Sequence, residues 1–135
     1  MTATPGENVL SRGSIRPRAI QPTGTVNGTG VDCSGSDYAA MVWTSGAITD
    51  GTFTLTIEES DVVGGSYTAV PAGRLINALP VWTTTNQNSQ AVTGFAVNTA
   101  KPFARGVCVV SGGATGGFIS ASVITTEIRL PVGYP

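Results

Sequence analysis

Hydrophobic and polar positions alternate strictly along residues 52–58, TFTLTIE. Phe53, Leu55 and Ile57 fall on one side of this segment, and the threonines fall on the other. A period of two predicts a β-strand with one face on a core and one face in water. The preceding segment, 38–44, is apolar on both sides, which predicts a central strand that runs antiparallel to it.

Other short segments are predicted to be strands because they are rich in β-branched and aromatic residues and bounded by glycine or proline. Residues 103–111 are apolar on both sides and predict a second central strand. Residues 90–97 are also predicted to form a strand, in which Gly94 predicts a bulge. Asn27-Gly28 predicts a hairpin turn. The remaining predictions are short strands around this turn within 23–33, strands at 66–70 and 118–127, and turns at 45–46, 50–51, 58–65 and 112–117.

The spacing of these segments predicts the fold. About seven or eight short strands, with a turn signal every ~8–12 residues, are typical of a β-sandwich or jelly roll. Only 11% of the 135 residues are charged and 18 are glycine, a composition that favours strands over helices. We therefore expect an all-β, single-domain β-sandwich or jelly roll with extended arms at both ends. Its predicted parts are a flexible or partner-ordered N-terminal arm (1–13), the β-sandwich (14–127) and an extended C-terminal tail (128–135).

Three arginines, Arg12, Arg16 and Arg18, lie close together near the N-terminus. The segment SIRPRAIQ (14–21), which holds Arg16 and Arg18, contains a proline and precedes another, which predicts an edge strand or an extended segment. Two interpretations stay open. The arginines form a solvated edge that discourages pairing between sheets, or they form a basic arm, together with Ile20, that contacts an acidic partner.

The last eight residues, IRLPVGYP, are apolar and carry two prolines. An apolar extended segment favours an intermolecular contact, because it is poorly soluble unless it packs on something. Leu130, Val132 and Tyr134 are the candidate contact residues of this tail.

The segment 71–90 is predicted to be irregular, but it contains several large apolar residues. Long loops in small domains are usually functional or involved in contacts. Trp82 in this segment has three open interpretations: it covers a core edge, it contacts a neighbouring subunit, or it forms a platform for a sugar.

Catalytic chemistry finds little support in the sequence. The chain has no histidine, and its one lysine, Lys101, has no partner that the sequence identifies. Two acidic turns, 32–37 and 58–61, could be considered as metal sites. In the first, Asp and Ser more often cap their own backbone. In the second, Glu58 and Glu59 are expected to point to opposite faces of a strand, which does not favour a shared metal ion. Two cysteines without histidine do not complete a zinc site. We expect a protein that is not an enzyme and binds no metal or cofactor.

Charge and hydropathy argue against nucleic acid and membranes as partners. The net charge of -1 supplies no basic field for nucleic acid, and no apolar run approaches the ~20 residues that cross a bilayer. Because the first residues lack the pattern of a signal peptide, we expect the chain to be made in the cytoplasm. There, Cys33 and Cys108 are expected to be two buried thiols, with a disulfide as the open alternative.

Three stretches, taken in order, resemble the head-decoration proteins of tailed bacteriophages, also called cement or capsid-stabilising proteins. Residues 28–46, GTGVDCSGSDYAAMVWTSG, begin the match. Residues 52–73 follow as a long strand, an acid-Ser-Asp turn, Gly-Gly-Ser-Tyr-Thr and Val-Pro-Ala. Residues 101–124, KPFARGVCVVSGGATGGFISASVI, resemble the family's Lys/Arg-aromatic-x-Arg strand, Gly-rich turn and final strand. The resemblance covers about residues 24–124 and departs around Trp82 and in the tail.

This resemblance implies a virion structural protein that binds the outer surface of a phage capsid. Its partner would be the major capsid protein, and it would act as a homotrimer that bridges capsid subunits. Residues 1–20 would reach a capsid subunit or an adjacent copy, while Trp82 and residues 130–134 would pack between subunits. The alternative is a carbohydrate- or receptor-binding β-sandwich of a virion fibre or tail, with Trp43, Tyr67 or Trp82 as an exposed stacking platform. A third interpretation is another structural protein of the tail or head fibre.

Overall fold

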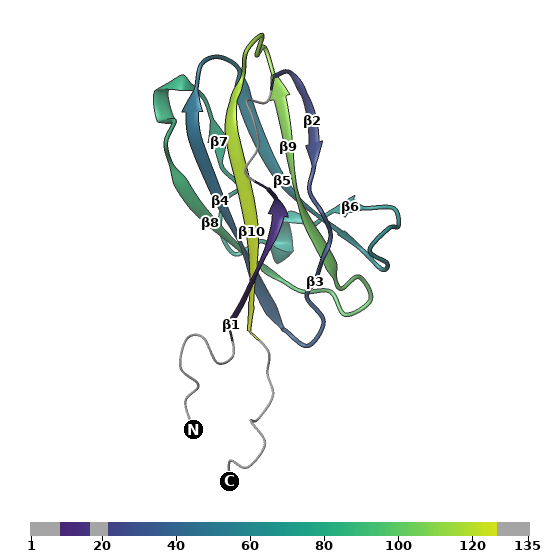
Figure 1. The fold of residues 1–135 in the computed structure, drawn as a ribbon. Helices are drawn as coiled ribbons and strands as arrows, with labels where there is room; N and C mark the ends of the chain where they lie inside the picture. Colours follow the sequence, from purple (N-terminus) through teal and green to yellow (C-terminus); the bar gives the residue numbers. More distant parts are fainter. Residues whose placement is uncertain (1–8, 17–21, 127–135) are drawn as a thin grey trace.

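The computed structural model describes residues 9–16 and 22–126. Its strands form two antiparallel sheets that stack on each other (Figure 1). This confirms the prediction of an all-β chain and agrees with a β-sandwich, whereas the jelly-roll connectivity stays a prediction.

Sheet A has four strands in the order β1-β10-β4-β8, so β10 and β4 are central. Every pair in it is antiparallel. The strands are β1 (Val9–Ile15), β10 (Gly117–Thr126), β4 (Tyr38–Ile48) and β8 (Gln90–Ala96).

Sheet B is built on two long central strands, β9 and β5, and its outer strands are short. On one side β2 and β3 both pair with β9, and on the other side β6 and β7 both pair with β5. The strands are β2 (Gly24–Asn27), β3 (Val31–Asp32), β9 (Phe103–Ser111), β5 (Thr52–Ser60), β6 (Thr68–Ala69) and β7 (Val81–Trp82), and the short helices are η1 (Ala72–Arg74) and η2 (Thr84–Asn86).

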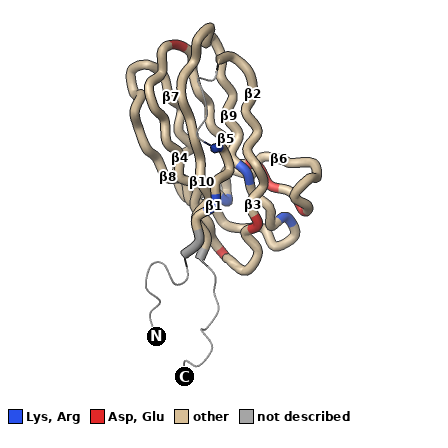
Figure 2. The backbone as a smooth tube through the Cα atoms, viewed as in Figure 1, with Lys and Arg blue, Asp and Glu red and all other residues tan. Residues whose placement is uncertain are grey.

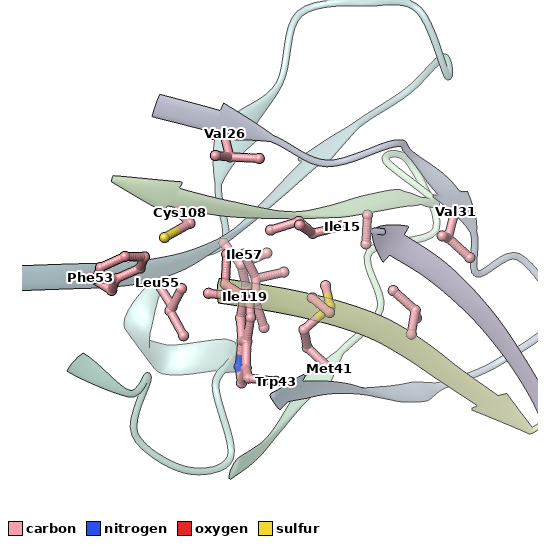
Figure 3. Packing of buried hydrophobic residues seen from close by; sticks show 14 of the residues in the cluster. Ile15, Val26, Val31, Met41, Trp43, Phe53, Leu55, Ile57, Cys108 and Ile119 are labelled. Carbon is pink, nitrogen blue, oxygen red and sulfur yellow. The ribbon is translucent and has the colours of Figure 1, made fainter. Parts of the chain in front are cut away.

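The core lies between the two sheets (Figure 3). Strand β5 buries Phe53, Leu55 and Ile57, which confirms the face predicted from its alternation. Trp43 of β4 is fully buried opposite them, and its indole Nε1 donates a hydrogen bond to Thr93 Oγ1 at 3.2 Å. The one polar atom of the largest core side chain is therefore satisfied inside the sandwich.

The predicted pairing of residues 38–44 with 52–58 is wrong. Strand β4 continues through Ser45 and Gly46 to Ile48 and lies in sheet A, whereas β5 lies in sheet B. The turn at Asp50-Gly51 thus carries the chain from one sheet to the other. Because both strands bury their apolar side chains in the same core, the hydrophobic pattern is the same as for a hairpin.

The hairpin predicted at Asn27-Gly28 is also wrong. Strands β2 and β3 do not pair with each other, and both run along the same edge of β9. Between them Gly28 N donates to Gly106 O at 2.8 Å, and Thr29 N donates to Ser14 O at 2.8 Å. Gly28 interrupts one strand rather than reversing it, because it lies against Ser14 and Gly106 and leaves no room for a Cβ.

Two further predictions need correction. Gly94 is not a bulge, because the register of β8 with β4 runs unbroken through it. The irregular pairings lie instead between Gly13 and Ile15 and between Gly117 and Ile119. Residues 9–13, which the sequence assigned to the arm, belong to β1 and pair with β10.

Candidate functional site

Trp82 lies in the core, so the subunit contact predicted for it needs correction. It pairs with Phe53 through β7 and is only 4% exposed. Of its three open interpretations, the structure selects core packing. The same burial argues against the carbohydrate-binding alternative, because Trp43 is also buried and neither ring presents a face to a ligand.

Tyr67 is half-buried, and one face of its ring is already covered. The guanidinium carbon of Arg105 lies 4.1 Å from the ring centroid, and Arg105 also forms an ion pair with Glu58 at 2.7 Å. The Tyr67 hydroxyl donates to Val63 O at 2.7 Å. This tyrosine therefore holds the turn after β5 in place, and Arg105 already stacks on the ring where the predicted sugar platform would need a free face.

The predicted arginine cluster is only partly described. Arg12 and Arg16 are exposed at β1 and just after it, as either interpretation requires. Arg18 and Ile20 lie outside the described residues, as do the tail residues Leu130, Val132 and Tyr134. Their predicted contacts stay predictions.

An apolar surface that the sequence did not identify lies on the outer face of sheet A. Val42 and Val92 are paired across β4 and β8, and Ala40 is paired with Ile124 of β10. Residues paired in this way lie side by side on one face. Ile76 covers the same face, because a Cβ at Gly94 would lie only 3.1 Å from Ile76 Cδ1. We call this surface the sheet A patch: Tyr38, Ala40, Val42, Ile76, Val92 and Ile124.

The sheet A patch is free of charge in its own strands. Strands β4, β8 and β10 contain no Asp, Glu, Lys or Arg. Most charged residues gather around β1, β3 and β6 instead (Figure 2). Three patch side chains, Tyr38, Ile76 and Val92, are among the exposed large hydrophobic residues of the described chain.

A sequence signal for this surface existed but was ambiguous. Residues 38–44 are apolar on both sides, and we interpreted this pattern as burial of both faces. The structure buries Ala39, Met41 and Trp43, while Tyr38 stays exposed and Ala40 and Val42 stay partly accessible. The pattern of residues is the same for an apolar strand face that is exposed on the surface and for one that is buried within the chain.

A second exposed apolar group lies at the turn after β5. Val62 and Val63 are each 54% exposed. The turn is held by hydrogen bonds from Gly65 N to Val62 O at 3.1 Å and from Val62 N to Ser60 Oγ at 3.3 Å. These two valines therefore stand in an ordered turn.

The two neighbouring carboxylates of β5 point to opposite faces, as the sequence predicted. Glu58 is partly exposed and binds Arg105, whereas Glu59 is buried and binds Arg74 of η1. Arg74 Nη1 also donates to Ala96 O at 2.9 Å. Arg74 thus ties the segment 71–90 to both sheets, and the carboxylates act as structural partners of arginines.

The cysteines are free and buried, which confirms the expectation of two thiols. Burial raises the pKa of the Cys108 thiol to about 12. Burial, with a smaller effect of the Asp32 carboxylate, raises the pKa of Cys33 to about 11. Neither thiol is activated as a nucleophile, because nucleophilic cysteines have a lowered pKa.

The turn that contains Asp32 is closed by its own side chain, as predicted. Ser34 N donates to Asp32 Oδ1 at 2.9 Å, and hydrogen bonds from Ser34 lower the pKa of Asp32. Within residues 9–16 and 22–126, no group of three or more potential metal ligands comes together. No helix in this part of the chain is long and apolar enough to span a membrane.

Comparison with known proteins adds no relative: no family model and no curated protein matches this sequence. The candidate site is therefore the set of surfaces described above, chiefly the sheet A patch.

Proposed function

We propose that this chain is a capsid decoration protein, a structural component that binds the outer surface of a phage head and stabilises it by bridging subunits of the major capsid protein. The observation that carries the proposal is the sheet A patch, an apolar surface on a strand face that has no charged residue of its own. Contiguous exposed apolar surface marks sites of protein contact. The patch therefore supports a protein that works within an assembly of protein chains, and the sequence resemblance identifies that assembly as a phage head.

The arrangement of the chain ends supports the same proposal. Val9 is paired with Thr126, so the segments 1–8 and 127–135 leave the sandwich from neighbouring strands at one end. Two segments that start side by side can each reach a different neighbour, a capsid subunit or an adjacent copy of the protein, at the same time. Several weak contacts on fixed neighbours add up to strong attachment through effective concentration.

In this proposal the protein acts as a homotrimer on the virion surface and needs no catalytic group. Arg12, in β1, and Arg16, just after it, are exposed, and in this proposal they contribute to the capsid contact. The contacts between copies come from residues 130–134 and not from Trp82, because Trp82 is buried in the core.

Binding to empty, expanded heads assembled without this protein tests the proposal. The full chain is expected to co-sediment with the heads and to saturate at a fixed number of copies per head. A variant that lacks residues 1–8 keeps all of β1, so it should fold normally but bind more weakly. Absence of saturable binding by the full chain would contradict the proposal.

A further inference from the structure

The sheet A patch needs an occupant, and the chain itself carries a segment of matching chemistry. We propose that residues 128–134 of one copy lie across the sheet A patch of a second copy, so that copies join head to tail. This inference rests on the proposed function only for the expectation that copies of the chain pack side by side. It names the surface that receives the tail.

The first argument is the pattern of the segment. From Ile128 onward, every second residue is apolar, and the residues between them are Arg129, Pro131 and Gly133. In an extended chain, alternate side chains point to the same side. One side of this segment therefore carries only apolar side chains: Ile128, Leu130, Val132 and Tyr134.

The second argument is a match of charge and size. The strands under the patch carry no charge, and the apolar side of the segment carries none either. The four apolar positions span six residue steps, roughly 20 Å in an extended chain. Along β4 the patch runs from Tyr38 to Val42, about 13 Å, and it continues across β8 and β10. The segment is thus long enough to cover it.

The third argument distinguishes a second copy from the same chain. Thr125 is paired with Ala39, so the described part of β10 ends beside Tyr38, at the end of the patch. To lie on its own patch, the chain would have to reverse at once, and a tight reversal takes four residues. Ile128 and Leu130 would then lie in the turn. A neighbouring copy can receive all four apolar side chains.

A contact between two different surfaces has a structural consequence. Each copy donates one segment and offers one patch, so the contact repeats from copy to copy. Such head-to-tail contacts close into a ring when the rotation between copies allows it. Three copies per ring would give the trimer of the proposed function.

Two variants remove one half of the contact each. Deletion of residues 128–135 removes the donated segment and keeps the patch. Val92→Lys places a charge in the patch and keeps the segment. The matched control is Val109→Lys, because Val109 is 42% exposed on the outer face of sheet B and Val92 is 49% exposed on sheet A. Circular dichroism and thermal melting show that each variant has folded.

Sedimentation velocity of these proteins tests the inference without a capsid. The full chain and Val109→Lys should form a concentration-dependent oligomer, expected as three times the subunit mass of 13.7 kDa. The deletion variant and Val92→Lys should each sediment as monomers. Their equimolar mixture should form a complex of one copy of each, because Val92→Lys donates a segment to the intact patch of the deletion variant.

Several results would overturn the inference. A full chain that stays monomeric at its solubility limit removes the contact altogether. An oligomer that persists in the folded deletion variant means that another surface joins the copies. A mixture that stays monomeric means that the segment does not cross to a second copy, and equal loss in Val109→Lys means that the patch is not specific. None of these results bears on head binding, which is measured separately.

Discussion

Gly106 lies where strand β9 passes the ring of Trp43. A Cβ at this position would lie 2.9 Å from Trp43 Cζ3 and 3.4 Å from Ala121 Cβ. Both neighbours are buried, so they have little room to move. Close approach of the sheets at this point requires a residue without a side chain.

We therefore expect Gly106→Ala to lower the free energy of unfolding by about 1–3 kcal/mol, the usual cost of overpacking a core. Gly73→Ala is the matched control, because nothing lies within 4 Å of a Cβ at position 73. Urea denaturation of the two variants measures the difference. A Gly106→Ala protein as stable as the Gly73→Ala protein would mean that the sheets are less tightly packed here than described.

The buried thiols predict a loss of stability at alkaline pH. The pKa of Cys108 is about 12 in the folded chain, against an ordinary value of 9.0. A group whose pKa is raised by folding stabilises the fold fully below its unfolded pKa, and this contribution is lost as the pH rises towards the folded pKa. The fold therefore starts to lose this stabilisation as the pH rises above 9.0, and for Cys33 the loss continues to a pH of about 11.

Unfolding in urea at about pH 8 and about pH 10 measures this effect, and each thiol contributes a slope of at most ~1.4 kcal/mol per pH unit. We expect Cys108→Ala to reduce the slope, whatever the cost of the substitution itself at neutral pH. An unchanged slope would show that ionisation of Cys108 is not coupled to unfolding.

At the scale of elements, the segment 71–90 depends on one side chain. Arg74 binds the buried Glu59 of sheet B and donates to Ala96 O at the end of β8 in sheet A. Next to it, Ile76 N donates to Gly94 O at 2.8 Å and Gly94 N donates to Asn77 Oδ1 at 2.8 Å. These bonds satisfy part of the free edge of β8, which would otherwise invite pairing with another sheet.

We expect Arg74→Met to lower the free energy of unfolding by about 2–3 kcal/mol, because Glu59 is left buried without its cation. The comparison is Arg105→Met, for which about 1 kcal/mol is expected, since Glu58 is partly solvated and the ring contact with Tyr67 adds only a little. Thermal and urea melts give both values. A loss for Arg105→Met equal to that for Arg74→Met would contradict the role assigned to the buried pair.

The sequence predicts a strand better than it predicts the neighbouring strand with which it pairs. The alternation at 52–58 identified β5 and its buried face, because a strand with one solvent-exposed face shows that pattern in its own residues. The sequence did not identify the strand that pairs with β5. Asp50-Gly51 suits a turn within one sheet and a turn between two sheets equally well, so β4 and β5 were paired incorrectly.

The candidate site was harder to predict for the same reason. The rule that aromatic residues mark contacts selected Trp82, but its burial depends on Phe53, which lies far away in the sequence. The sheet A patch joins residues from three strands and the segment 71–90, and only the register brings them together. No local pattern distinguishes such a surface from a core face.

At the scale of the whole molecule, the two sheets differ in what they offer to partners. Strands β4, β8 and β10 of sheet A carry no charged residue, whereas β5 of sheet B supplies the carboxylates of the ion pairs Glu58–Arg105 and Glu59–Arg74. The segments 1–8 and 127–135 both begin at one end of sheet A. A molecule of this kind has one apolar face and one end at which the first and last described strands lie side by side, which suits attachment to a lattice of subunits.

The most direct test of the central claim is the temperature at which empty, expanded heads come apart, measured with and without a saturating amount of this protein. If the protein bridges capsid subunits, the heads that carry it should disassemble at a higher temperature, and the deletion of residues 1–8 should reduce the gain. Heads that bind the protein but come apart at an unchanged temperature would contradict a capsid-stabilising function.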